Sequence, residues 1–76
     1  MTTISADLAR QRLGEILGGW IPCPDDHRFL AMLMHVASTQ QFVRLHDNII
    51  DTYGGTSGER LWEMGRQELA RMTEER

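Results

Sequence analysis

The sequence predicts an all-α protein, a small bundle of three to four helices without a β-sheet. Glycine, proline and capping residues divide the chain into four segments, at about 5–17, 25–37, 39–53 and 57–73. Apolar residues in these segments recur at the three- and four-residue spacing of a helix. No segment shows the sustained apolar–polar alternation of a half-buried strand. We therefore expect a single helical domain over residues 1–76.

The first predicted helix covers residues 5–17 and has one apolar face. At about 100° of rotation per residue, five apolar side chains share this face: Ala6, Ala9, Leu13, Ile16 and Leu17. Gly14 borders the face and is expected to allow a close neighbour. Gly18 and Gly19 are expected to end the helix because glycine readily adopts the left-handed cap conformation. We expect Trp20 and Ile21 to fold back as apolar anchors.

The second predicted helix, residues 25–37, contains the most apolar run of the chain. Residues 29–36 read FLAMLMHV, seven apolar side chains in eight. The apolar arc covers roughly 200° of the helix, and only Ala31, His35 and Ser38 lie outside it. A helix that is apolar around most of its circumference must be buried on most of it. We therefore expect a central helix, covered by the other segments or by another chain.

The third predicted helix, residues 39–53, is the most clearly amphipathic. Its apolar face comprises Phe42, Val43, Leu45, His46, Ile49, Ile50 and Tyr53. If the second and third segments formed one helix, the apolar face would swing by about 140° between them. Ser38 and Gln41 also have the spacing of a capping box, which marks a helix start. We therefore predict a break at residues 37–39.

The fourth predicted helix, residues 57–73, follows a glycine-rich turn. Gly54-Gly55 is expected to end the third helix. Thr56 and Glu59 have the spacing of a capping box for the fourth. The apolar stripe comprises Leu61, Trp62, Gly65, Leu69 and Met72, with Met64 at its edge. Gly65 within the stripe predicts a close approach between two helices.

The charge balance disfavours general nucleic-acid binding. The net charge is −3, and affinity for nucleic acids comes mainly from neutralising phosphates. All eight basic residues are arginine, which we attribute to GC-rich codon usage in a bacterium or one of its phages. The longest wholly apolar stretch, residues 29–34, is far shorter than the roughly 20 residues that span a bilayer.

The single cysteine, Cys23, excludes a disulfide within the chain and favours a reducing compartment. The first residues lack the basic and apolar regions of a signal peptide. We therefore expect a cytoplasmic protein with no membrane association.

The only pair with metal-ligand spacing is Cys23 and His27. Zinc needs three or four ligands, and His35 and His46 are poorly placed to complete a site. We predict no metal and no cofactor, with Cys23 as a half-buried thiol and His27 as an exposed histidine; zinc binding by this pair is left open. His46 is expected to be a core or interface histidine with one hydrogen-bond partner, or alternatively part of a pH-sensitive interface.

No catalytic set of nucleophile, base and orienting group is visible, so we do not expect an enzyme. Residues 54–58 with Arg60 resemble an anion cradle in composition but lack the preceding strand and the Gly-Lys-Ser/Thr ending of a P-loop. We predict a plain interhelical turn there.

A helix-turn-helix over the second and third segments is the alternative functional hypothesis. Gln40, Gln41 and Arg44 would then read base edges. The same helix carries Asp47 and Asp51, and the protein has little positive charge to hold phosphates.

The remaining class is protein interaction. We predict a small helical protein-binding module, an adaptor or inhibitor of bacterial or phage origin that occupies a surface on a partner protein. We further predict a homodimer, because methionine and tryptophan are common in contact surfaces. A monomer whose core absorbs these residues is the alternative. The predicted interface residues are Leu30, Met34, Trp62, Met64, Leu69 and Met72.

Overall fold

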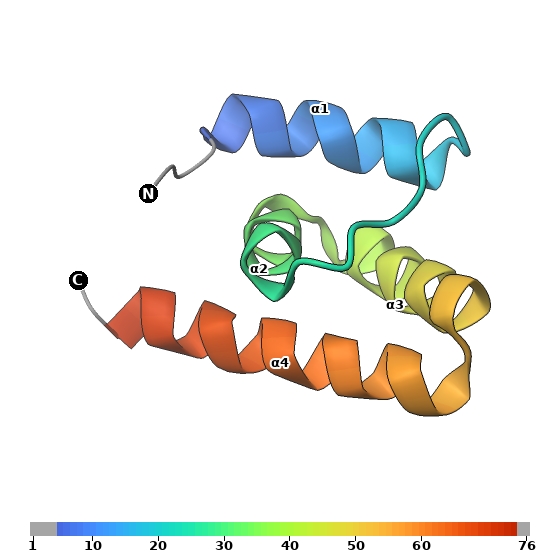
Figure 1. Ribbon diagram of the computed structural model, residues 1–76. Helices are drawn as coiled ribbons and strands as arrows, with labels where there is room; N and C mark the ends of the chain where they lie inside the picture. Colours follow the sequence, from blue (N-terminus) through green and yellow to red (C-terminus); the bar gives the residue numbers. More distant parts are fainter. Residues whose placement is uncertain (1–4, 75–76) are drawn as a thin grey trace.

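The computed structural model describes residues 5–74, which contain four helices. In chain order they are α1 (Ala6–Leu17), α2 (His27–Val36), α3 (Thr39–Tyr53) and α4 (Gly55–Glu74) (Figure 1). These residues include no strand, which confirms the predicted all-α bundle.

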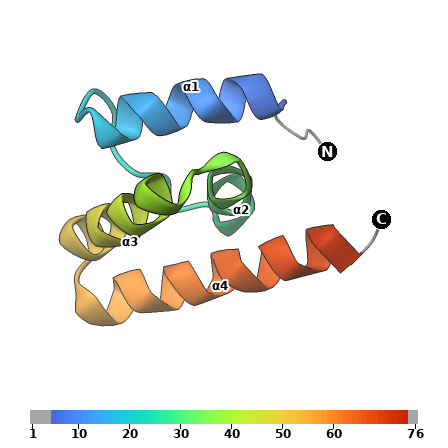
Figure 2. The ribbon, with the colours of Figure 1, turned by 180° about the vertical axis from the view of Figure 1, so that it is seen from behind.

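Helix α2 is the central element, as its composition predicts. It runs across the molecule, with α1 on one side and α4 on the other, and α3 lies beside it (Figures 1 and 2). Leu30 and Leu33 are fully buried between these helices. Ala31, which was placed outside the apolar arc, is fully buried as well, so the buried side of α2 extends beyond that arc. Arg28 and His35 are the exposed side chains of α2.

The glycine pair after α1 ends that helix as predicted. Gly19 has a φ of 84°, and its N–H donates to the carbonyl of Ile16 at 3.1 Å. The N–H of Trp20 donates to the carbonyl of Glu15 at 2.8 Å. Together these two bonds form a Schellman motif, which satisfies the last carbonyls of the helix.

The predicted break between the second and third segments is also present. Helix α2 ends at Val36 and α3 begins at Thr39. The N–H of Gln41 donates to Ser38 Oγ at 3.2 Å, and the N–H of Ser38 donates to Gln41 Oε1 at 2.9 Å. This reciprocal capping box lets the chain turn between two helices over two residues.

The turn before α4 differs from the prediction. Gly54, with a φ of 88°, ends α3 by donating its N–H to the carbonyl of Ile50 at 2.9 Å. Helix α4 then begins at once, at Gly55. Thr56 already lies inside the helix, so the predicted capping box of Thr56 and Glu59 does not form. Residues 54–58 are therefore a tight turn and a helical start.

Glycines in α1 and α4 have opposite surroundings. A Cβ at Gly65 would lie 2.9 Å from Leu30 Cδ2 and 3.0 Å from Met34 Cε, which confirms the predicted close approach of helices. A Cβ at Gly14 would have nothing within 4 Å, so the neighbour predicted there is absent. Helix α1 contacts the core through Ala9, Leu13 and Ile16, and Gly14 is exposed.

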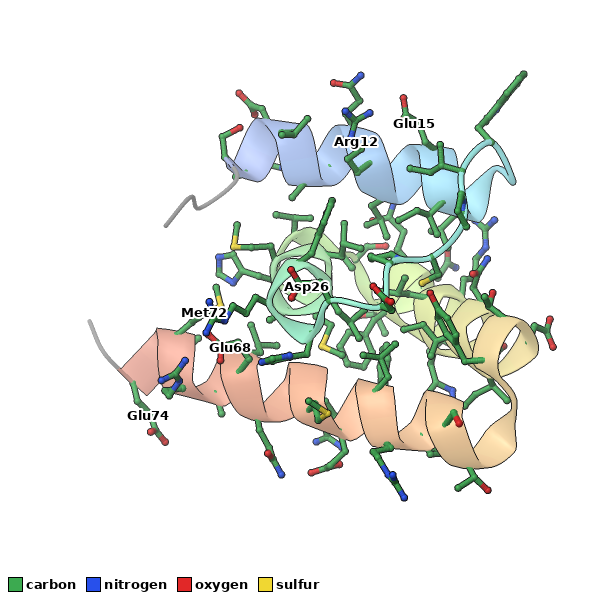
Figure 3. The ribbon with its side chains drawn as sticks, in the orientation of Figure 1. Arg12, Glu15, Asp26, Glu68, Met72 and Glu74 are labelled. Atoms are coloured by element: carbon green, nitrogen blue, oxygen red, sulfur yellow. The ribbon has the colours of Figure 1, made fainter. Side chains whose placement is uncertain are left out.

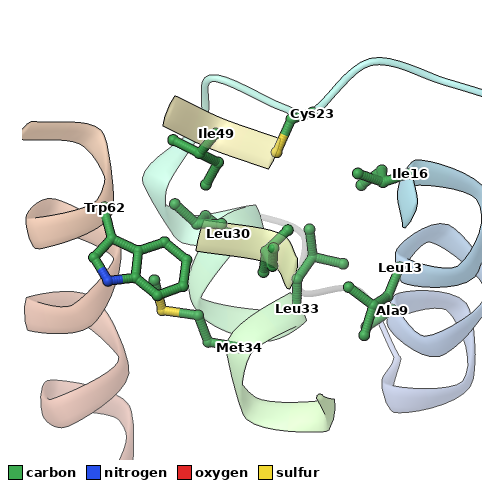
Figure 4. Packing of buried hydrophobic residues seen from close by; sticks show 10 residues of the cluster. Ala9, Leu13, Ile16, Cys23, Leu30, Leu33, Met34, Ile49 and Trp62 are labelled. Carbon is green, nitrogen blue, oxygen red and sulfur yellow. The ribbon is translucent and has the colours of Figure 1, made fainter. Parts of the chain in front are cut away.

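The core draws on every helix and on the loop before α2 (Figure 4). Its buried members are Ala9, Leu13, Ile16, Cys23, Leu30, Leu33, Met34, Leu45, Ile49 and Trp62.

Candidate protein-binding surface

The six residues predicted for an interface fall into two groups. Leu30, Met34 and Trp62 are buried among the chain's own helices, so they are not on the surface of the isolated chain. Leu69 and Met72 are half-buried, and Leu69 packs against the core. Met64 is 41% exposed. Contact of these last three residues with another chain stays a prediction.

The most exposed large apolar residue is Trp20, at 83%. The prediction that it folds back as a core anchor was wrong. Trp20 is the last residue of the Schellman motif, and its Cδ1 would lie 3.1 Å from a Cβ at Gly18. The indole therefore lies beside the backbone at the end of α1. No periodicity in this loop could have indicated that placement.

Val43 on α3 is also exposed, at 55%, although it was placed on the apolar face. The helical wheel explains this difference. Val43 precedes the buried Leu45 by two residues, which places the two side chains about 200° apart. Because Leu45 and Ile49 define the buried side of α3, Val43 faces outward.

A hydrogen bond brings the exposed part of α3 to the end of α1. Arg44 Nη2 donates to the carbonyl of Leu17 at 3.2 Å. Leu17 is the last residue of α1 and lies three positions before Trp20. We call Trp20 and Arg44 the tryptophan end. The loop that carries Trp20 lies remote from the start of α1 and the end of α4 (Figure 1).

His46 connects α3 to α4. Its Nε2 lies 3.2 Å from Glu59 Oε2, and its ring centroid lies 4.9 Å from that of Trp62 in an edge-to-face arrangement. Phe42 contacts Trp62 in the same manner, also at 4.9 Å. His46 is thus a half-buried histidine with one hydrogen-bond partner across the helix pair, in keeping with the first of its two predicted roles.

Cys23 is fully buried, whereas a half-buried thiol was predicted. Burial raises the pKa of this thiol to about 11, so it remains protonated and unreactive at neutral pH. Tyr53 donates its hydroxyl proton to the Cys23 carbonyl, which fixes the loop against α3. His27 is half-buried instead of exposed. Among residues 5–74, no three His, Cys, Asp or Glu side chains are grouped closely enough to hold a metal ion.

A shallow hollow of about 220 Å³ lies between the first turn of α2 and α4. Its lining residues are His27, Met64, Gln67, Glu68 and Arg71. Arg71 Nη2 contacts both Glu68 carboxylate oxygens, at 2.8 and 3.0 Å. The side chain of Glu68 lies on the side of α4 that faces α2 (Figure 3). The hollow is open and polar, with Met64 as its only apolar side chain.

The fold and these surfaces define a small all-α helical bundle whose large exposed apolar residues, within 5–74, are Trp20 at the tryptophan end, Val43 on α3 and Met64 on α4. Comparisons with known protein families, characterised proteins and solved structures found no match. No helix within residues 5–74 has both the length and the apolar character required to cross a membrane.

Proposed function

We propose that this chain is a cytosolic, non-catalytic protein-binding module that acts by occupying a surface on a partner protein. The observation that carries the proposal is the 83% exposure of Trp20. Tryptophan is enriched among the few residues that dominate protein–protein binding. Its indole offers a partner a large apolar area, with an N–H that can still donate a hydrogen bond.

The surroundings of Trp20 support this role. The Schellman motif fixes the backbone directly before the indole, so binding requires little ordering of the chain. Arg44, which bonds to the carbonyl of Leu17, adds an exposed charged side chain near the indole. Arginine, like tryptophan, is enriched at binding hot spots. The tryptophan end thus combines residue types that are typical of contact surfaces.

The test compares three purified proteins as baits in a lysate of a GC-rich bacterium: the unchanged chain, Trp20→Ala, and Arg66→Ala as an exposed control on α4. We expect the unchanged chain and the control to retain the same protein, and Trp20→Ala to lose it. Because Trp20 is largely exposed, its replacement is expected to leave the melting temperature unchanged. Equal recovery by all three baits would refute binding through the tryptophan end.

DNA binding through α3 is the alternative function, and the geometry gives it less support. Asp47 and Asp51 are exposed on the same helix and would repel phosphates. A gel shift at low salt tests this alternative, and a retarded DNA band that disappears as salt increases would favour it over protein binding.

We also propose that the module is a homodimer. Met64 supports this proposal because it is a large apolar side chain that the chain's own helices leave 41% exposed on α4.

A further inference from the structure

The outer side of α4 is a long surface that no other helix covers. Helix α4 lies along one edge of the molecule in both views (Figures 1 and 2). The helix has 20 residues, and its exposed side chains follow a spacing of three and four. Seven of them lie along the middle of the exposed side and form what we call the outer stripe: Arg60, Glu63, Met64, Gln67, Ala70, Arg71 and Glu74.

The charges of the outer stripe are antisymmetric about Gln67. Four residues before Gln67 stands Glu63, and four residues after it stands Arg71. Seven residues before it stands Arg60, and seven residues after it stands Glu74. Each charge therefore has an opposite charge at the same distance on the other side of Gln67. A surface with this property is complementary to itself after a rotation of 180°.

We propose that a second copy of this chain packs its α4 antiparallel on the outer stripe, with the two-fold axis passing through Gln67. This inference rests on the proposed homodimer and names its surface. Arg60 then faces Glu74 of the second copy, about 10 Å along the helix from the axis. Glu63 faces Arg71 of the second copy, about 6 Å from the axis. Symmetry repeats each pair, so four ion pairs connect the two copies.

The centre of the stripe suits the same axis. A glutamine amide has both donors and an acceptor, so two Gln67 side chains can bond each other across a two-fold axis. Met64 faces Ala70 of the second copy, a large side chain against a small one. The hollow lined by Met64, Gln67 and Arg71 lies next to this point and provides room for side chains of the second copy.

Other arrangements bring like charges together. When the second copy slides by three residues in one direction, Arg60 faces Arg71 of the second copy. When it slides by three residues in the other direction, Glu63 faces Glu74. In a parallel arrangement in register, each charged residue faces the same residue of the second copy, so every pair has like charges. The antiparallel arrangement about Gln67 is therefore the one that the charges favour among these four.

Two of these charges, Arg60 and Glu74, have no ion-pair partner among residues 5–74. Glu74 is the last residue of α4 and points away from the other helices (Figure 3). The helix dipole disfavours an acidic side chain at a C-terminal end. Pairing with a second copy gives Glu74 a favourable partner that its own helix lacks.

The test uses two charge reversals, Arg60→Glu and Glu74→Arg, in the full chain. In a homodimer of either variant, positions 60 and 74 carry like charges and face each other, and the two-fold axis repeats this repulsive pair. We expect each variant to dissociate with a Kd about tenfold higher than that of the unchanged chain. Mixed in equal amounts, the two variants regain opposite charges at both positions and should associate as tightly as the unchanged chain. The double variant should also regain self-association.

Sedimentation equilibrium at low salt measures these constants, and circular dichroism checks the fold. Glu74→Arg agrees better with the helix dipole than the native residue does, and Arg60 is exposed and lies beyond the first turn of α4, so neither reversal should weaken folding. Raising the salt concentration should weaken the dimer. If the unchanged chain is monomeric throughout, the proposed homodimer fails. If it dimerises but neither reversal changes its Kd, or mixing restores nothing, another surface forms the dimer and the present inference alone is refuted.

Discussion

Replacing Gly65 by alanine is expected to destabilise the fold, whereas the same replacement at Gly14 is expected to stabilise it. At Gly65 the new methyl group would lie 2.9 Å from Leu30 Cδ2 and 3.0 Å from Leu30 Cγ. Leu30 is fully buried, so it has little room to move away. At Gly14 the methyl group would meet nothing within 4 Å. Both positions lie inside helices, so the two variants differ chiefly in packing.

The expected magnitudes follow from two opposing effects. Alanine is favoured over glycine inside a helix by about 1 kcal/mol, and this gain applies at both positions. Overpacking a well-packed core costs about 1–3 kcal/mol, and this cost applies only at Gly65. Gly14→Ala should therefore raise the free energy of unfolding by up to about 1 kcal/mol. Gly65→Ala should lie about 1–3 kcal/mol below Gly14→Ala.

Urea denaturation followed by circular dichroism at 222 nm measures both free energies of unfolding. For a chain of this size, 1 kcal/mol corresponds to about 4–8 °C in melting temperature, which gives an independent check. If Gly65→Ala stabilises the protein as much as Gly14→Ala does, α2 and α4 do not approach as closely as described, and the reasoning fails.

Three further predictions concern the loop, the caps and the tryptophans. Folding raises the pKa of the Cys23 thiol to about 11 and also raises the pKa of the Tyr53 hydroxyl, so the folded state favours both protonated forms. Their contribution to the free energy of unfolding is therefore complete below about pH 9 and is lost as the pH rises further. For Cys23 the loss by pH 11 is about 2 kcal/mol, and urea denaturation of Cys23→Ala across this range should show a smaller decline. Ser38→Ala removes the N-cap of α3 and should lower the free energy of unfolding by about 1 kcal/mol in the same assay; an unchanged value would contradict the capping box. Iodide should quench the fluorescence of Trp20 but hardly that of buried Trp62, so Trp20→Phe should leave a weakly quenched, blue-shifted emission.

Features that depend on neighbouring residues could be predicted from the sequence. The capping box of Ser38 and Gln41 needs only a hydroxyl and an amide three residues apart, and it forms as expected. The glycine ending of α1 is equally local. At Thr56 and Glu59 the same spacing failed, because Gly54 already closes α3 and α4 starts one residue later. The glycine that ends α3 and the capping-box spacing predict different starts for α4, and the sequence pattern alone does not show which start is adopted.

Burial was harder to predict because it depends on which helices meet. Ala31 is small and lies on the less apolar side of its helix, yet other helices cover it. Trp20 is large and apolar, yet it is exposed because the cap of α1 directs the chain past the core. For the candidate surface, the sequence predicted the exposed Met64 but missed Trp20 and Val43. Helix periodicity shows which residues share a face, but it does not show whether another helix lies against that face.

The position of α2 between α1 and α4 has a consequence for the order of folding. The most apolar helix is made early in synthesis, whereas α4, which covers one of its sides, is made last. A nascent chain that ends before Gly65 lacks the part of α4 that lies against Leu30, so this leucine is left without part of its native cover. The growing chain therefore passes through a stage in which α2 exposes apolar surface that chaperones or other nascent chains can bind.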